Sequence, residues 1–77
     1  PTHFLVIPKA HIGSAAEITG ENSAVVAHIF QVIAKLCKDL GLDSYRIVSN
    51  IGEQAGQSVH HLHFHVLSGR DMTWPPG

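Results

Sequence analysis

The stretch SVHHLHFHVL, residues Ser58–Leu67, contains four of the seven histidines in the chain. From His61 onward the histidines alternate with large apolar residues. This alternation is the period of a β-strand, in which successive side chains point to opposite faces. We therefore predict a strand with two different faces. His61, His63 and His65 form the histidine face, and Leu62, Phe64 and Val66 form the packed apolar face.

Imidazoles spaced in this way can act together on one small chemical group. Residues two apart on a strand lie about 7 Å from each other, so the rings can reach a common ligand, although their positive charges would repel. We expect at most one or two rings to be protonated near neutral pH, which leaves at least one neutral nitrogen as nucleophile, base or metal ligand. His63 is the only ring flanked on both sides along the strand, and it is the predicted nucleophile.

The length of the chain predicts one small domain, residues 1–77. A domain of this size buries only about 60% of its unfolded surface and is marginal alone. Together with a long apolar helix, this predicts a symmetric homodimer.

The charge balance limits the classes of partner. The formal net charge is -1, and the 5 Lys and Arg residues are scattered, so we expect no nucleic-acid partner and no membrane partner. No apolar run reaches the roughly 18 residues of a membrane span. Cys37 is the only cysteine, which excludes an internal disulfide and fits a reducing compartment. We expect cytoplasmic localisation, with the nucleus as a second location.

Two further strands and one helix are predicted from the remaining pattern. His3–Ile7 is strand-like and ends at Pro8, and Lys9–Glu21 is a connection with a short helical turn. Tyr45–Asn50 is a strand that pairs with the histidine strand through a glycine-containing loop. The resulting fold class is α+β, an antiparallel β-sheet with one long helix packed on it.

The helix is indicated by apolar residues that recur every three or four positions up to Leu40. Thr19 is the candidate N-terminal cap, Glu21 is favourable in the first turn, and Gly41 supplies the C-terminal stop. The apolar positions are Val25, Val26, Ile29, Phe30, Ile33, Leu36, Cys37 and Leu40.

Three interpretations of the histidine face compete: a solvated polar face, a metal site and a nucleophilic site. Solvated strand faces usually carry Thr, Lys, Glu and Ser, so three aligned imidazoles weigh against the first. Three histidines can hold a catalytic zinc ion, and the spacing alone leaves this possible. The loop Ala55–Ser58, AGQS, offers close backbone N–H groups, an amide and a hydroxyl, which suit a phosphate or oxyanion. The combination favours phosphoryl chemistry without a metal or other cofactor.

The sequence HLHFHVL, residues 61–67, resembles the His-φ-His-φ-His-φ-φ motif of the histidine triad (HIT) superfamily, where φ is apolar. THFLVIPKAHI near the start, GQSV before the triad and GRDMTWPPG at the end look like the Hint branch of purine nucleoside phosphoramidases. The resemblance implies that the chain is the C-terminal portion of a HIT domain. It lacks the family's upstream strands and short helix, which provide the purine pocket and an acidic residue for the ribose.

The resemblance also implies roles for individual residues. His63 matches the histidine that attacks the α-phosphorus of a purine nucleoside phosphoramidate, His65 matches one that contacts phosphate and supports departure of the amine, and His61 matches one that orients the nucleophile. His3 matches a further site histidine, and Trp74 an aromatic residue on the leaving-group side, contributed across the family's dimer interface. The residues that match the ribose and phosphate pocket are Asn50, Gly56, Gln57 and Ser58, together with His63 and His65.

The expected function is hydrolysis of AMP- or GMP-type phosphoramidates through a covalent nucleotidyl-histidine. Two alternatives remain open: a dinucleoside polyphosphate hydrolase with the same triad, and a nucleotide-binding regulatory module with incidental turnover. His60 departs from the Hint pattern, which usually has tyrosine there. His11 and His28 are expected to be surface or packing residues.

Overall fold

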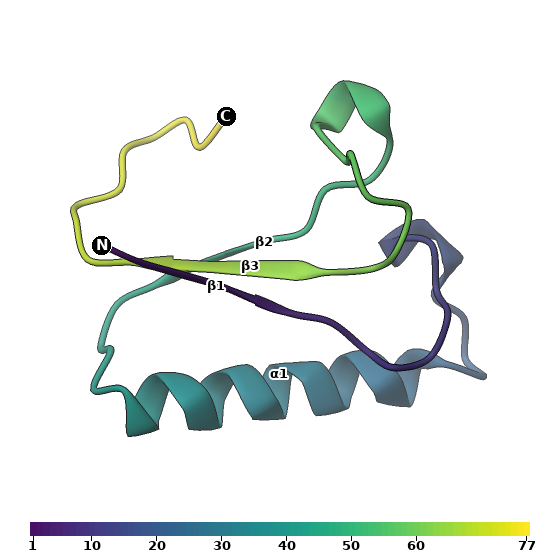
Figure 1. Cartoon of the computed structure of the whole chain (residues 1–77), viewed down its shortest axis with the longest axis horizontal. Coiled ribbons are helices and arrows are strands. Elements are labelled where there is room, and N and C mark those ends of the chain that lie inside the picture. Colours follow the sequence, from purple (N-terminus) through teal and green to yellow (C-terminus); the bar gives the residue numbers. More distant parts are fainter.

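The computed structural model describes all 77 residues and contains one three-stranded sheet with one long helix (Figure 1). The strands are β1 (Thr2–Val6), β2 (Arg46–Val48) and β3 (Phe64–Ser68). The strand order is β1-β3-β2, and both pairs are antiparallel. The predicted α+β class and the pairing of the last two strands are therefore confirmed, and the histidine strand lies at the centre of the sheet.

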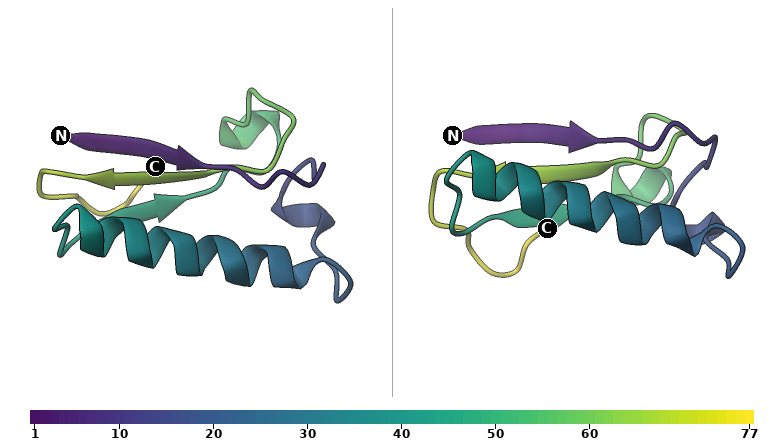
Figure 2. Two further views of the ribbon diagram at one scale, coloured as in Figure 1. Left: turned by 60° about the horizontal axis from the view of Figure 1, so that its bottom comes forward. Right: turned by 90° about the horizontal axis from the view of Figure 1, so that it is seen from below.

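The helix α1 (Ser23–Asp39) covers one face of this sheet, as the views from two further directions show (Figure 2). Its buried residues Ile29, Ile33 and Cys37 pack in one core cluster with Leu62, Phe64 and Val66. Because burial alternates along residues 61–68, the even-numbered side chains face α1 and the odd-numbered ones face away from it. The predicted separation of a packed face and a histidine face is confirmed.

The start of α1 differs from the prediction. Asn22 occupies the N-cap position, whereas Thr19 lies in the turn before it. The Thr19 hydroxyl accepts a hydrogen bond from the backbone N–H of Glu21, and the Asn22 side chain accepts one from the N–H of Thr19. Thr19 therefore stabilises the approach to the helix and does not cap it.

Two strands, β2 and β3, are shorter than their sequence patterns, whereas β1 has the expected length but is shifted by one residue, Thr2–Val6 in place of His3–Ile7. The segment predicted as Tyr45–Asn50 pairs only over Arg46–Val48, and the ladder of β3 begins at Phe64, so His61 and His63 precede it. Alternation reports which face of a segment is packed. It does not report whether the backbone of that segment pairs with a neighbouring strand. The two residues keep their strand-like exposure outside the ladder.

Two short 3-10 helices occupy the connections. The first, η1 (Ala15–Glu17), confirms the helical turn expected between Lys9 and Glu21. The second, η2 (Glu53–Ala55), rises on the face of the sheet opposite α1 (Figure 1). The loop before the triad therefore stands beside the histidine face.

Large apolar side chains along and just after α1 are solvent-exposed: Phe30 and Leu36 in the helix and Leu40 at its C-cap. This is the surface on which the prediction of a homodimer rests, and it stays a prediction. The structure contains no helix with the length and apolar character needed to cross a membrane.

Candidate active site

Three imidazoles gather on the open face of the sheet. Nε2 of His3 and Nδ1 of His65 are 2.9 Å apart and share a hydrogen bond. The ring of His65 lies 5.1 Å from that of His3 and 5.1 Å from that of His63, measured between centroids. The sheet register explains the first contact, because β1 lies directly beside β3 with Leu5 opposite His65 and His3 opposite Leu67.

The ring of His63 is oriented by its own backbone. Its Nδ1 lies 2.7 Å from the carbonyl oxygen of His61. Because a carbonyl can only accept, Nδ1 carries a hydrogen, and in the neutral ring the unshared lone pair is then on Nε2. This is the tautomer that a nucleophilic Nε2 requires.

The ring of His61 does not stack with that of His63. Its Nε2 donates to the carbonyl oxygen of Pro8 at 3.0 Å, and its ring meets that of His11 edge-on at 5.8 Å. The sequence argument that His63 is the ring with two imidazole neighbours is therefore wrong, because His65 is flanked by both His63 and His3. The alternation could not reveal this, since the second neighbour comes from β1.

The pKa of His65 lies below its ordinary value of 6.5. Partial burial is the main cause, because it disfavours the charged ring, and repulsion by His63 and then by His3 adds to it. His65 is therefore a neutral donor or acceptor at neutral pH. This agrees with the expectation that not every ring of the cluster is charged.

We expect this shift to respond to its neighbours in a defined order. In an NMR titration, His65 should titrate below pH 6.5, because the folded state disfavours its protonation. His63→Gln should raise the midpoint more than His3→Gln, since His63 is the stronger source of repulsion. His28→Gln, on the helix, should leave the midpoint unchanged. A midpoint above 6.5 in the wild-type protein would contradict the assigned environment.

Gln57 organises the loop that precedes the triad. The side chain is only 8% exposed. Its Nε2 donates to the carbonyl oxygens of Gly13 at 2.7 Å and Val59 at 3.1 Å, and its Oε1 accepts from the N–H of Gly52 at 3.0 Å. The amide is therefore engaged within the chain and holds η2 against the segment before η1.

The other expected pocket residues lie around this loop. Gly56 has a φ of 95°, a left-handed conformation that favours glycine, and ends η2. A Cβ at Gly56 would lie 3.6 Å from Nδ2 of Asn50, so the two residues are close. Ser58 is exposed. Their assignment to ribose and phosphate stays a prediction.

Trp74 lies apart from the histidines in this chain. Its side chain is 84% exposed, and it borders a shallow groove along β2 that contains no histidine. The segment before it is held by Arg46, whose guanidinium donates to the carbonyl oxygen of Thr73 at 3.1 Å. The leaving-group role of Trp74 stays a prediction.

A small hollow borders the nucleophile candidate. It has a volume of about 340 Å³ and is lined by Leu5, Ile7, Val59, His61 and His63. Leu5 and Ile7 were not predicted as site residues, although the period of two places them on the same face of the segment His3–Ile7 as His3. The hollow is mostly apolar and suits an uncharged part of a ligand.

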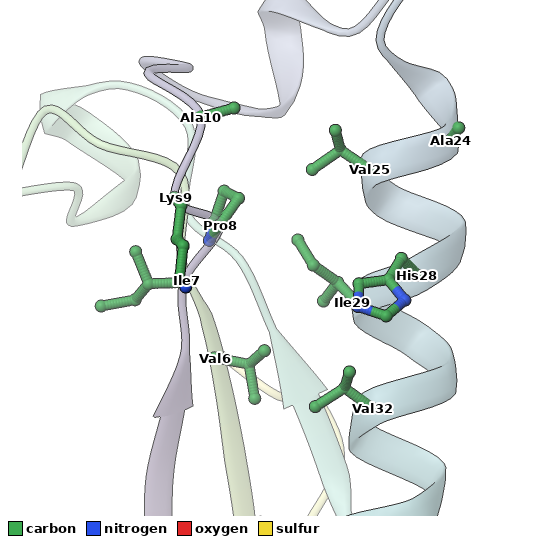
Figure 3. A pocket seen from close by; sticks show the side chains of 10 residues that line it. All are labelled: Val6, Ile7, Pro8, Lys9, Ala10, Ala24, Val25, His28, Ile29 and Val32. Carbon is green, nitrogen blue, oxygen red and sulfur yellow. The ribbon is translucent and has the colours of Figure 1, made fainter.

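The largest groove lies elsewhere, between the end of β1 and α1 (Figure 3). Its volume is about 610 Å³, and apolar side chains such as Val25, Ile29 and Val32 dominate its walls. His28 and Lys9 are its only titratable residues, and no second imidazole faces them. Because reactive groups converge on the opposite face of the sheet, the triad face is the better candidate site.

The histidine cluster also bears on the metal interpretation. No three His, Cys, Asp or Glu side chains of the chain are arranged to hold a metal ion. His61 uses its Nε2 for the Pro8 carbonyl and His63 its Nδ1 for the His61 carbonyl, and each ring keeps its second nitrogen.

The fold and the histidine cluster define a histidine triad protein, and a family model for the HIT domain matches residues 1–72. The chain belongs to the HIT domain family. It is 44% identical to an uncharacterised HIT-like protein of Synechococcus elongatus, over 100% of this chain and 68% of that protein.

Solved structures support the same family. A HIT family hydrolase from Legionella pneumophila is 44% identical with a TM-score of 0.95, and the match covers 100% of this chain and 70% of that one. A HIT family hydrolase from Clostridium thermocellum is 43% identical with a TM-score of 0.90, and the match covers 95% of this chain and 65% of that one. The chain thus spans about two thirds of the length of these relatives.

Proposed function

We propose that the chain carries the catalytic histidines of a hydrolase acting on purine nucleoside 5'-phosphoramidates, as in the Hint branch. The observation that carries the proposal is the hydrogen bond from Nδ1 of His63 to the His61 carbonyl, which leaves Nε2 as a free nucleophile. The similarity to HIT family hydrolases supports hydrolysis as the reaction class. The purine and the amine come from the resemblance of the GQSV and WPPG segments.

The proposed reaction has two displacement steps. When the anionic substrate binds, the His3–His65 pair takes up one proton from solvent. Nε2 of His63 attacks the α-phosphorus, the P–N bond to the amine breaks, and the amine leaves with that proton, donated by His65. Water then attacks phosphorus, His65 takes back a proton, and the bond from phosphorus to Nε2 breaks to release the nucleoside monophosphate. The covalent intermediate divides one difficult displacement into two easier ones.

The contact between His3 and His65 suits this exchange of protons. If Nε2–H of His3 donates to Nδ1 of His65, then His65 carries its own hydrogen on Nε2, where it can meet the phosphoryl group or the departing amine. The lowered pKa keeps His65 from being charged before the anionic substrate arrives. The negative phosphoryl group then favours a shared positive charge on the pair.

Turnover in the presence of a chelator tests the proposal. We expect the full-length protein to release amine and AMP from an adenosine phosphoramidate at an unchanged rate in EDTA, because imidazoles supply both the nucleophile and the acid. A three-histidine zinc site would instead lose its nucleophilic water with the ion. Diadenosine polyphosphate is the control substrate.

Three results would reject the proposal in different ways. Loss of turnover in EDTA with recovery in zinc would identify a metal site. Preference for the diadenosine polyphosphate would identify the related hydrolase class. Binding of AMP with no turnover of either substrate would identify a regulatory nucleotide-binding module.

A further inference from the structure

The residue that bears the proposed nucleophile lies just outside the sheet. The ladder between β2 and β3 ends at the pair Val48 and His65, and β3 begins at Phe64. The backbone of His63 is therefore not held by strand pairing. Other contacts must fix it if Nδ1 is to meet the His61 carbonyl reproducibly.

Two hydrogen bonds provide this support, one at the residue before His63 and one at the carbonyl of His63. The N–H of Leu62 donates to the carbonyl oxygen of Ile12 at 2.6 Å. The hydroxyl of Ser49 donates to the carbonyl oxygen of His63 itself at 2.8 Å, in a partly buried position. Ser49 follows β2 directly, so its hydroxyl continues the connection between the strands past the last ladder pair.

We propose that Ser49 is a positioning residue that holds the backbone of His63 and thereby the tautomer and aim of its ring, an inference that rests on the proposed function. Ser49 acts through His63 and is not expected to touch the substrate. Its loss leaves the His63 carbonyl without its partner and lets the residue move relative to the His61 carbonyl. Displacements of about 1 Å at a reacting group can cost roughly 100-fold in rate.

The opposite end of the same ladder offers a matched control. The hydroxyl of Ser68, the last residue of β3, donates to the carbonyl oxygen of Ser44, just before β2, at 2.7 Å. The two bonds are chemically alike, and they lie at the two ends of the ladder between β2 and β3. Ser68 lies at the far end of β3 from His63, so Ser68→Ala should weaken the sheet and leave the nucleophile in place.

The kinetic test compares Ser49→Ala, Ser49→Thr and Ser68→Ala in the full-length protein. With an adenosine phosphoramidate, Ser49→Ala should slow formation of the nucleotidyl-histidine about 10-fold to 100-fold with KM changed less than about twofold. Ser49→Thr keeps the hydroxyl and should restore most of the rate. Ser68→Ala should remain within about twofold of wild type, even if its Tm falls as much as that of Ser49→Ala.

A measurement without substrate separates this inference from the proposed function. Nitrogen-15 NMR of the His63 ring should show hydrogen on Nδ1 in the wild-type protein, a larger share of the Nε2–H tautomer in Ser49→Ala, and no change in Ser68→Ala. If the wild-type protein turns over no phosphoramidate, the proposed function fails while this spectrum still tests Ser49. An unchanged tautomer and rate in Ser49→Ala, or an equal loss of rate in Ser68→Ala, would overturn the inference.

Discussion

Replacing His63 by alanine is expected to abolish both the covalent nucleotide adduct and turnover. The ring is the proposed bond-forming group, and Nε2 is its free nitrogen because Nδ1 is engaged with the His61 carbonyl. Rapidly quenched full-length protein, analysed by mass spectrometry after incubation with an adenosine phosphoramidate, should carry one AMP per chain at His63. No adduct should form in His63→Ala.

The neighbouring histidines provide the comparison. His61→Ala and His65→Ala should slow the reaction by roughly 100-fold to 10,000-fold and still form a detectable adduct at His63, because acid and positioning roles supply only part of the acceleration. His28→Ala, on the helix, should behave as wild type. An adduct on His65 or His3, or full activity in His63→Ala, would reject the assignment of the nucleophile.

Gln57→Ala is expected to have the largest effect on stability among the loop residues. It removes one donor group and one acceptor that together satisfy three backbone groups, all in a side chain that is 8% exposed. Leaving those groups unpaired should lower the free energy of unfolding by roughly 2–3 kcal/mol. In a domain of this size the loss corresponds to a decrease in Tm of roughly 10–20 °C in a thermal melt.

Two further substitutions distinguish the effect of the Gln57 hydrogen bonds from the effect of changing any residue of this loop. Gln57→Glu keeps the shape but places carboxylate oxygens against the carbonyl oxygens of Gly13 and Val59, so it should destabilise at least as much as alanine at neutral pH. Gln54→Ala changes the same residue type at an exposed position of η2 and should leave Tm unchanged. Equal effects at Gln54 and Gln57 would contradict the role assigned to the Gln57 amide.

Sequence periodicity predicted the fold because it reports burial. The three-and-four spacing identified α1, and the alternation from His61 identified which side chains pack against it. The strand order could not be predicted in the same way, because β1 reaches the central strand through a pairing that only tertiary structure specifies. The ends of β2 and β3 were also predicted wrongly, because the apolar alternation continues past the last ladder pair. There a hydrogen bond from the Ser49 hydroxyl replaces the backbone ladder.

The candidate site shows the same division between local pattern and long-range contact. Three histidines could be grouped from the alternation alone, and the resemblance to the family added His3. The hydrogen bond from His61 to Pro8 and that from Gln57 to Gly13 connect segments far apart in the chain, so no local pattern reports them. Gln57 was predicted to line the ribose and phosphate pocket. The structure shows its amide bonded to backbone groups of Gly13, Gly52 and Val59, and its contact with a ligand stays a prediction.

The pairing of β1 with β3 has a consequence for how the site is lost on unfolding. His3 and His65 are separated by 62 positions in the sequence, and they meet only because the first strand docks on the last one. Closing so long a segment costs chain entropy that is recovered only when the whole sheet forms. A partly folded chain that retained α1 and the loop would therefore hold His61 and His63 without the proton-sharing partner of His65. We therefore expect catalytic activity and the folded sheet to be lost together in a single unfolding transition.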